Sequence, residues 1–167
     1  MKMSKVIKSK KAKIRRASGE TIAEFGPALW ILLICIFFPL VDILSMGVSY
    51  GLCVVLNSNQ VKEAALLPWS AATDPSGTVM KQIPEMWESG MGHFVKMSGQ
   101  PQTLVAYRTG QTGTDQITDK IVGVRTTISC SPFLSIPVPF VSCPGLNAPM
   151  VFQITSEKPM ENPDNGQ

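Results

Sequence analysis

An uncharged apolar run near the N-terminus most constrains how this chain can fold. Residues 25–41 carry no charged side chain, and within residues 25–56 the only formally charged one is Asp42. As an α-helix, the uncharged run would rise roughly 25 Å, close to the hydrocarbon thickness of a bilayer. The run therefore predicts one membrane-spanning helix.

Basic residues are concentrated before this run. Residues 1–19 hold eight Lys and Arg side chains and no acidic one, whereas the rest of the chain has seven basic and twelve acidic side chains, a net charge of about −5. The basic run is thus local, and the remaining chain offers no basic surface for nucleic acid. By the positive-inside bias, we predict a cytoplasmic N-terminus and an exported C-terminal region.

Three interpretations of the N-terminus compete. One is a secretory signal peptide cleaved after small residues near Gly47 or Ser49, although the run has no clear A-x-A-like site. Another is a plain uncleaved signal anchor. Neither gives a role to Gly19 or to Glu24, the carboxylate that directly precedes the run.

The third interpretation rests on the order of residues before the run. The basic residues are followed by Gly19, then by the sequence ETIAEF and the apolar helix. This order resembles the processing site of type IV prepilins, in which a membrane aspartyl peptidase cuts after the glycine. The resemblance makes Glu24 the fifth residue of the mature chain. Glu20 departs from it, because pilins usually have an apolar or small residue at the first mature position.

More of the chain is similar to one branch of this family, the TadE-like minor pilins (pseudopilins) of the Tad/Flp pilus system. That branch has a Glu-Phe pair entering the apolar segment, an acidic residue near its far end, an alanine-containing continuation of the helix and a small β-rich C-terminal region. The matching segments are Glu24 with Phe25, Asp42 in VDILSMG, VKEAALL at residues 61–67, VRTTISCSPF and MVFQITSEKPMEN.

The resemblance implies a minor pilin precursor, cleaved by a prepilin peptidase and taking part in assembly of a Tad-type pilus for adhesion or secretion. It implies a single-pass protein of the bacterial inner membrane with an extracytoplasmic C-terminal domain. Its partners would be that peptidase, other minor pilins, the major pilin, the platform membrane proteins and membrane lipid, with no cofactor. The alternative is a membrane-anchored extracytoplasmic binding domain that does not assemble into a fibre.

An ionised Glu24 is costly beside lipid unless a positive charge pairs with it. Cleavage after Gly19 would create an α-amino group on Glu20, and in pilins the corresponding glutamate is thought to pair with that amine of a neighbouring subunit. We therefore predict that Glu24, Phe25 and Asp42 act in subunit assembly. The competing interpretations place Glu24 in the solvated headgroup region and make Asp42 the exit of the helix from the bilayer.

Hydrophobic periodicity and turn residues predict an α+β fold. We expect a leader at 1–19, a transmembrane and stalk helix at 20–67 kinked at Pro39, an extracytoplasmic domain at 68–156 and a disordered tail at 157–167.

Within the predicted domain, we expect a loop at 69–78 and a short or broken helix at 79–94. The apolar face of that helix would comprise Val79, Ile83, Trp87, Met91 and Phe94. Three strands forming an antiparallel sheet are expected at 103–108, 121–130 and 150–156. One face of the second strand would carry Val122, Val124, Thr126 and Ile128. The proline-rich segment 132–149 is expected to be an apolar loop.

The four cysteines divide into two pairs along the chain. Cys35 and Cys53 lie in the apolar helix, where a free cysteine behaves as a small apolar side chain. Cys130 and Cys143 flank the proline-rich segment, and we predict a disulfide between them if the compartment is oxidising.

No catalytic motif is visible in the sequence. There is no glycine-rich phosphate loop, no G-x-S-x-G and no His-based nucleophile arrangement. His93 is the only histidine, too few ligands for a zinc site, and Glu85 and Glu88 are expected on an exposed helix face. We therefore predict that the chain is not an enzyme and binds no metal.

Overall fold

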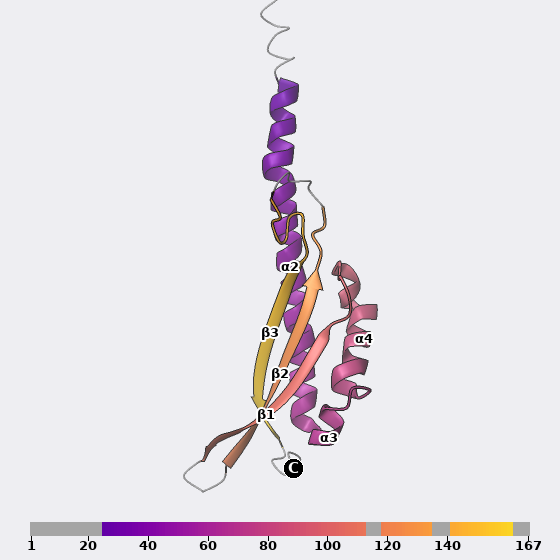
Figure 1. Cartoon of the computed structure of the whole chain (residues 1–167), viewed down its shortest axis with the longest axis vertical. Helices are drawn as coiled ribbons and strands as arrows, with labels where there is room; N and C mark the ends of the chain where they lie inside the picture. Colours follow the sequence, from indigo (N-terminus) through magenta and orange to yellow (C-terminus); the bar gives the residue numbers. More distant parts are fainter. Residues whose placement is uncertain (1–24, 113–117, 135–140, 162–167) are drawn as a thin grey trace, which may run out of the picture. The chain divides into compact units, whose positions relative to one another are not determined.

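The computed structural model describes residues 25–112, 118–134 and 141–161 (Figure 1). The chain divides into two compact units, Met1–Val41 and Asp42–Gln167. A continuous helical segment, Phe25–Leu66, begins in the first unit and ends in the second. It stops before Pro68, as the sequence predicts, because proline cannot continue a helix and restricts the residue before it.

The described residues contain two π-helical turns, and each ends two residues before a proline. The turn η1 (Leu33–Phe37) precedes Pro39, and η2 (Thr78–Gln82) precedes Pro84. A proline has no N–H for the regular helical bond, and its ring collides with the carbonyl four residues earlier. A wider turn moves that carbonyl aside. The disturbance predicted at Pro39 therefore takes the form of a local π turn, followed by α2 (Phe38–Leu66).

The second unit contains a three-stranded antiparallel sheet in the order β1-β2-β3. Its strands are β1 (Gln102–Thr112), β2 (Thr118–Cys130) and β3 (Met150–Pro159). All three predicted strands are confirmed, and each is longer than predicted. Together with the long helix and a short one, the sheet confirms the α+β layout.

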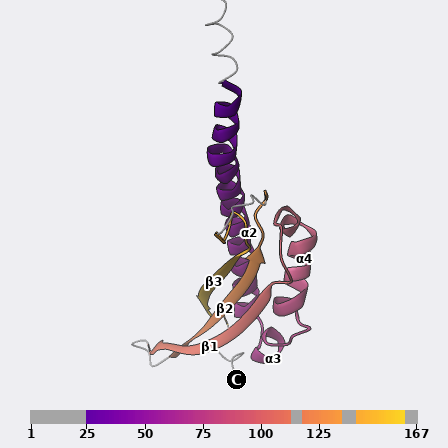
Figure 2. The same cartoon turned by 45° about the horizontal axis from the view of Figure 1, so that its top comes forward.

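In the second unit, α2 lies along one face of the sheet (Figures 1 and 2). The predicted inner face of β2 is buried: Val122, Val124, Thr126 and Ile128 are each at most 1% exposed. The three apolar residues among them divide between two apolar clusters, each joining α2 to the sheet. One cluster contains Val61, Ala64, Ala65, Ala72, Val79, Val105, Val122, Val124 and Met160. The other contains Met46, Cys53, Leu56, Trp87, Val95, Ile128, Cys130 and Ile154.

The segment between α2 and the sheet is more helical than expected. The expectation of a loop at 69–78 is wrong for residues 69–72, because Pro68 opens a short helix, α3 (Trp69–Ala72), and it is confirmed for residues 73–77. The predicted broken helix is confirmed as η2, α4 (Ile83–Ser89) and η3 (Met91–Phe94). In both views these elements lie on the β1 side of α2 (Figures 1 and 2).

The predicted apolar face of this segment ends at Trp87. Val79 and Trp87 are buried, but Met91 is 45% and Phe94 80% exposed. Gly92 explains the change, since a Cβ there would lie 2.6 Å from the Trp87 ring. The indole thus packs directly against the backbone of η3, while the side chains of Met91 and Phe94 are exposed.

The strand β3 continues beyond its predicted end at residue 156. It runs to Pro159, and Met160 is buried against the first apolar cluster. The Met160 N–H donates to the carbonyl of Lys120, 2.9 Å away, and the Glu161 N–H donates to that of Ala65, 3.3 Å away. The expectation of disorder is therefore wrong for residues 157–160, while residues 162–167 lie outside the described part.

A buried polar network joins the middle of α2 to the sheet. The Asn57 amide donates to the Val124 carbonyl and to the Thr126 hydroxyl, both at 2.9 Å. That hydroxyl donates to Oε1 of Gln60, 2.7 Å away, and the Gln60 amide donates to the Thr103 hydroxyl, also 2.7 Å away. Because an unpaired polar group in an apolar core is costly, the network fixes the register of the helix on the sheet.

We predict that Asn57→Ala destabilises the full chain by about 2 kcal/mol, because it leaves buried partners without a donor. Asn59→Ala is the matched control. Asn59 has the same side chain on the same helix but is exposed, and its loss should cost less than about 0.5 kcal/mol. Thermal unfolding in detergent, followed by near-UV circular dichroism, measures both; equal effects would contradict the assigned role of the network.

Candidate functional site

The N-terminal half of the helical segment presents a broad apolar surface. Between residues 25 and 40 its large exposed side chains are Phe25, Leu29, Trp30, Ile31, Leu32, Ile34, Ile36, Phe37 and Leu40. A surface of this kind marks contact with lipid or with another protein. By length and composition, Phe25–Leu66 is the one helix among the described residues that could cross a membrane.

Of the residues predicted to act in processing and assembly, Phe25 begins the described part of this helix. Phe25 is 67% exposed at its first described position. Gly19, Glu20 and Glu24 fall outside the described residues, so their predicted roles remain predictions.

Asp42, the first charged residue after the apolar run, is fully buried. Its Oδ1 accepts a hydrogen bond from the backbone N–H of Leu134, 2.7 Å away, while Oδ2 has no partner among the described residues. The carboxylate thus fastens the segment after β2 to the beginning of the second unit. The structure gives Asp42 a contact within its own chain, and its contact with a neighbouring subunit remains a prediction.

We predict that Asp42→Ala speeds hydrogen exchange at the Leu134 amide by about tenfold or more, because the amide loses a buried acceptor. Asp74→Ala is the matched control. The Asp74 side chain also accepts one backbone N–H bond, from Ser76, but on an exposed loop. Exchange of the full chain in detergent, read by mass spectrometry, should leave Leu134 unchanged in the control. Unchanged exchange in Asp42→Ala would contradict the anchoring role.

Beyond Asp42, an apolar pocket of about 410 Å³ lies between α2, the end of the proline-rich segment and β3. Its lining residues are Ile43, Met46, Gly47, Tyr50, Pro144, Gly145, Leu146, Met150 and Phe152. A Cβ added at Gly47 or Gly51 would meet no atom within 4 Å, so the helix surface there is open. The sequence analysis did not identify this pocket, because its walls come from segments about 100 residues apart.

The cysteines are arranged differently from the predicted pairing. Cys130 and Cys143 are free thiols in the structure. The Cys130 side chain instead lies with that of Cys53 in the second apolar cluster, and each thiol shifts the pKa of the other, raising that of Cys53 and lowering that of Cys130. Cys143 lies half-buried in a turn, where its N–H donates to Oδ1 of Asn147, 2.6 Å away. The disulfide between Cys130 and Cys143 remains a prediction, and Cys53 is a competing partner.

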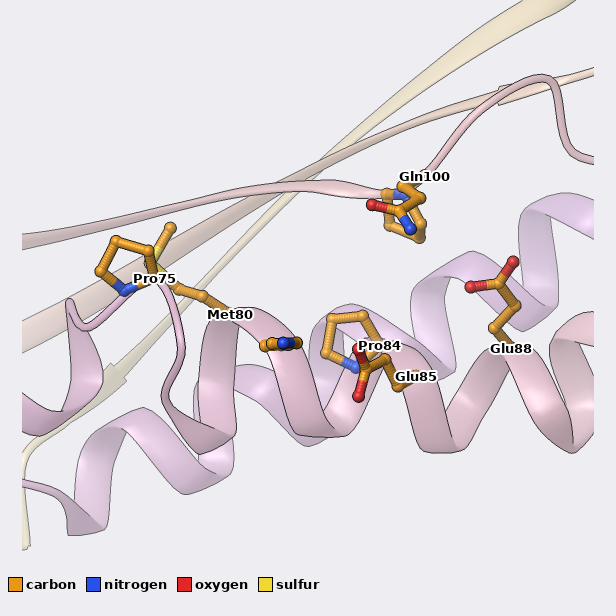
Figure 3. Close-up of a pocket in the computed structure, with 8 residues that line it drawn as sticks. Pro75, Met80, Pro84, Glu85, Glu88 and Gln100 are labelled. Atoms are coloured by element: carbon orange, nitrogen blue, oxygen red, sulfur yellow. The ribbon is translucent and has the colours of Figure 1, made fainter.

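A more polar pocket of about 430 Å³ lies beside α4 (Figure 3). Glu85 and Glu88 extend from the helix, and Gln100 lies on the segment across from it (Figure 3). Lys81 also lines this pocket, and His93 lines an adjoining one with Glu88. Among the described residues, no group of three or more His, Cys, Asp or Glu side chains could hold a metal ion. The prediction that the chain is not an enzyme stays a prediction.

Charge on the solvent side of the sheet is arranged in pairs. The Arg108 guanidinium on β1 donates to the Glu157 carboxylate on β3. This contact lowers the pKa of Glu157 and raises the pKa of Arg108. Because both side chains are exposed, solvent screens the pair, and it adds little to stability.

Comparison of the chain with family models, with curated proteins and with solved structures gave no match. Its function must therefore be argued from the exposed apolar helix, the buried contacts of the second unit and the residues that precede the helix.

Proposed function

We propose that this chain is the precursor of a TadE-like minor pilin of a Tad-type pilus, cleaved after Gly19 and held in the inner membrane by residues 25–41. The prepilin peptidase, other minor pilins, the major pilin and the platform proteins are its proposed partners. The C-terminal domain is proposed to lie on the extracytoplasmic side.

The observation that carries this proposal is a change of surroundings within one helix. Phe25–Leu66 is continuous. Its side chains up to Leu40 are largely exposed and apolar, while from Asp42 onward it buries a stripe of residues against a small sheet. A membrane span that continues into the stalk of a small α+β domain fits this pattern. An isolated anchor would need no such continuity.

The residues before the helix add the chemistry of assembly. Glu24 is the last charged residue before the apolar run. The new α-amine of Glu20 from a neighbouring subunit would neutralise its carboxylate. The same contact would set the axial register between the two subunits. Within the described part of the helix, the first basic side chain is that of Lys62.

We predict that the mature protein begins at Glu20. Gly19→Leu should leave the precursor uncut, because the peptidase accepts only a small residue before the scissile bond. Ala17→Leu, two residues upstream, is the matched control and should be processed. Intact mass and N-terminal sequencing of the membrane-extracted protein show which residue begins the mature chain. A mature N-terminus at Met1 would favour the signal anchor, and one near Tyr50 the signal peptide.

We predict that Glu24→Gln retains membrane insertion and most of the cleavage but lowers incorporation with other pilins. The expected loss is about 1 to 3 kcal/mol, or roughly five- to 150-fold, by analogy with other charge-assisted contacts. Glu24→Asp keeps the charge and should restore part of the incorporation. Crosslinking to the other minor pilins in intact cells measures the effect.

Normal crosslinking of Glu24→Gln would contradict the paired-carboxylate mechanism. Normal function of a precursor that stays uncut at Gly19 would contradict the pilin assignment itself. The remaining interpretation would then be the membrane-anchored binding domain that does not enter a fibre.

A further inference from the structure

We propose that Cys53 and Cys130 form a disulfide that joins α2 to β2 across the core. This bond differs from the disulfide predicted between Cys130 and Cys143, and Cys130 can form only one of the two. Formation of this bond in the cell rests on the proposed function, because only an exported domain meets a disulfide-forming environment.

The first argument is the position of the two thiols. Both cysteines are 0% exposed, and both belong to the apolar cluster that joins α2 to β2 and β3. Each thiol also shifts the pKa of the other, as expected of neighbours in one buried cluster.

The second argument is that the backbone on both sides is held in place. Cys130 ends β2, pairs with Met150 on β3 and forms a bridge with Met97 on its other side. Next to Cys53, the Leu52 carbonyl accepts a hydrogen bond from the Trp87 indole, 3.1 Å away. Since a disulfide tolerates only a narrow range of Cα separations, a fixed backbone keeps the same two cysteines facing each other once the domain has folded.

The third argument compares the two partners available to Cys130. Cys143 lies 13 positions away, whereas Cys53 lies 77 positions away. The longer loop contains α3, α4, β1 and most of β2, and closing it restricts the unfolded chain more. A bond to Cys53 therefore stabilises the helix on the sheet, while a bond to Cys143 would close only the proline-rich segment.

The chemistry is thiol–disulfide exchange with an oxidant that carries a disulfide, either oxidised glutathione or a thiol–disulfide oxidoreductase. One cysteine thiolate attacks a sulfur of the oxidant, forms a mixed disulfide and expels a thiolate. The second cysteine thiolate then attacks the protein sulfur and releases the other half of the oxidant as a thiolate. Two electrons pass to the oxidant, and the two thiol protons pass to the released thiolates.

The test is a disulfide map of the full chain. Protein extracted from membranes is quenched with acid, alkylated without reductant and digested with pepsin at low pH, which prevents exchange. We expect one linked pair, Cys53 with Cys130, and alkylated Cys35 and Cys143. A link between Cys130 and Cys143 would overturn the proposal. Four alkylated cysteines would also overturn it if they are found both in the membrane-extracted protein and in the refolded protein described next.

Refolding separates this proposal from the proposed function. Reduced, denatured full-length chain is refolded in detergent with a glutathione redox buffer, where topology plays no part. The Cys53–Cys130 link in refolded protein supports the proposed pair even if the membrane-extracted protein is reduced. That combination would instead count against export of the domain. A refolded chain that links other cysteines overturns the proposal.

Variants distinguish the bond from simple packing. We expect reductant to lower the thermal unfolding midpoint of the native chain by about 10 °C. Cys35→Ser and Cys143→Ser should keep this response, while Cys53→Ala and Cys130→Ala should lose it, whatever their own starting midpoints. A response to reductant that survives in Cys53→Ala would contradict the pairing.

Discussion

The hydrogen bonds among Asn57, Gln60 and Thr126 are the constraint on which the second unit depends. Apolar clusters on either side of them would tolerate small shifts of α2, because hydrophobic contact has little directional preference. An amide that must reach a strand carbonyl and a hydroxyl tolerates no such shift. The network therefore sets which helical residue faces which strand residue, and the other cross-core contacts follow from that register.

One consequence is the arrangement of polar residues along the buried side of α2. Asp42, Ser49, Asn57 and Gln60 are buried, and each makes a hydrogen bond. They alternate with apolar residues at helical spacing of three or four. A search for hydrophobic periodicity alone misses this stripe. Its polar members resemble solvent-exposed residues, and the exposed residues beside the stripe are as apolar as its buried apolar members.

A second consequence concerns force and assembly. In the proposed pilin, tension on the membrane helix would reach the sheet through the side chains that α2 buries. Those contacts are the polar network, the two apolar clusters and the proposed bond between Cys53 and Cys130. Asp42 adds an anchor at the start of the second unit through Leu134. The sheet is thus fastened to α2 at several positions along the helix.

The sequence by itself determined the long apolar helix, its end before Pro68, the disturbance at Pro39 and the three strands of the sheet. Each depends on charge, proline or periodicity within a short segment, which local physics decides. Only the tertiary structure decided that Asp42 is buried, that β3 continues to Pro159 and that Cys130 shares a buried cluster with Cys53. These outcomes depend on the register of α2 against strands about 70 to 100 residues away, and no local pattern encodes such a distant register.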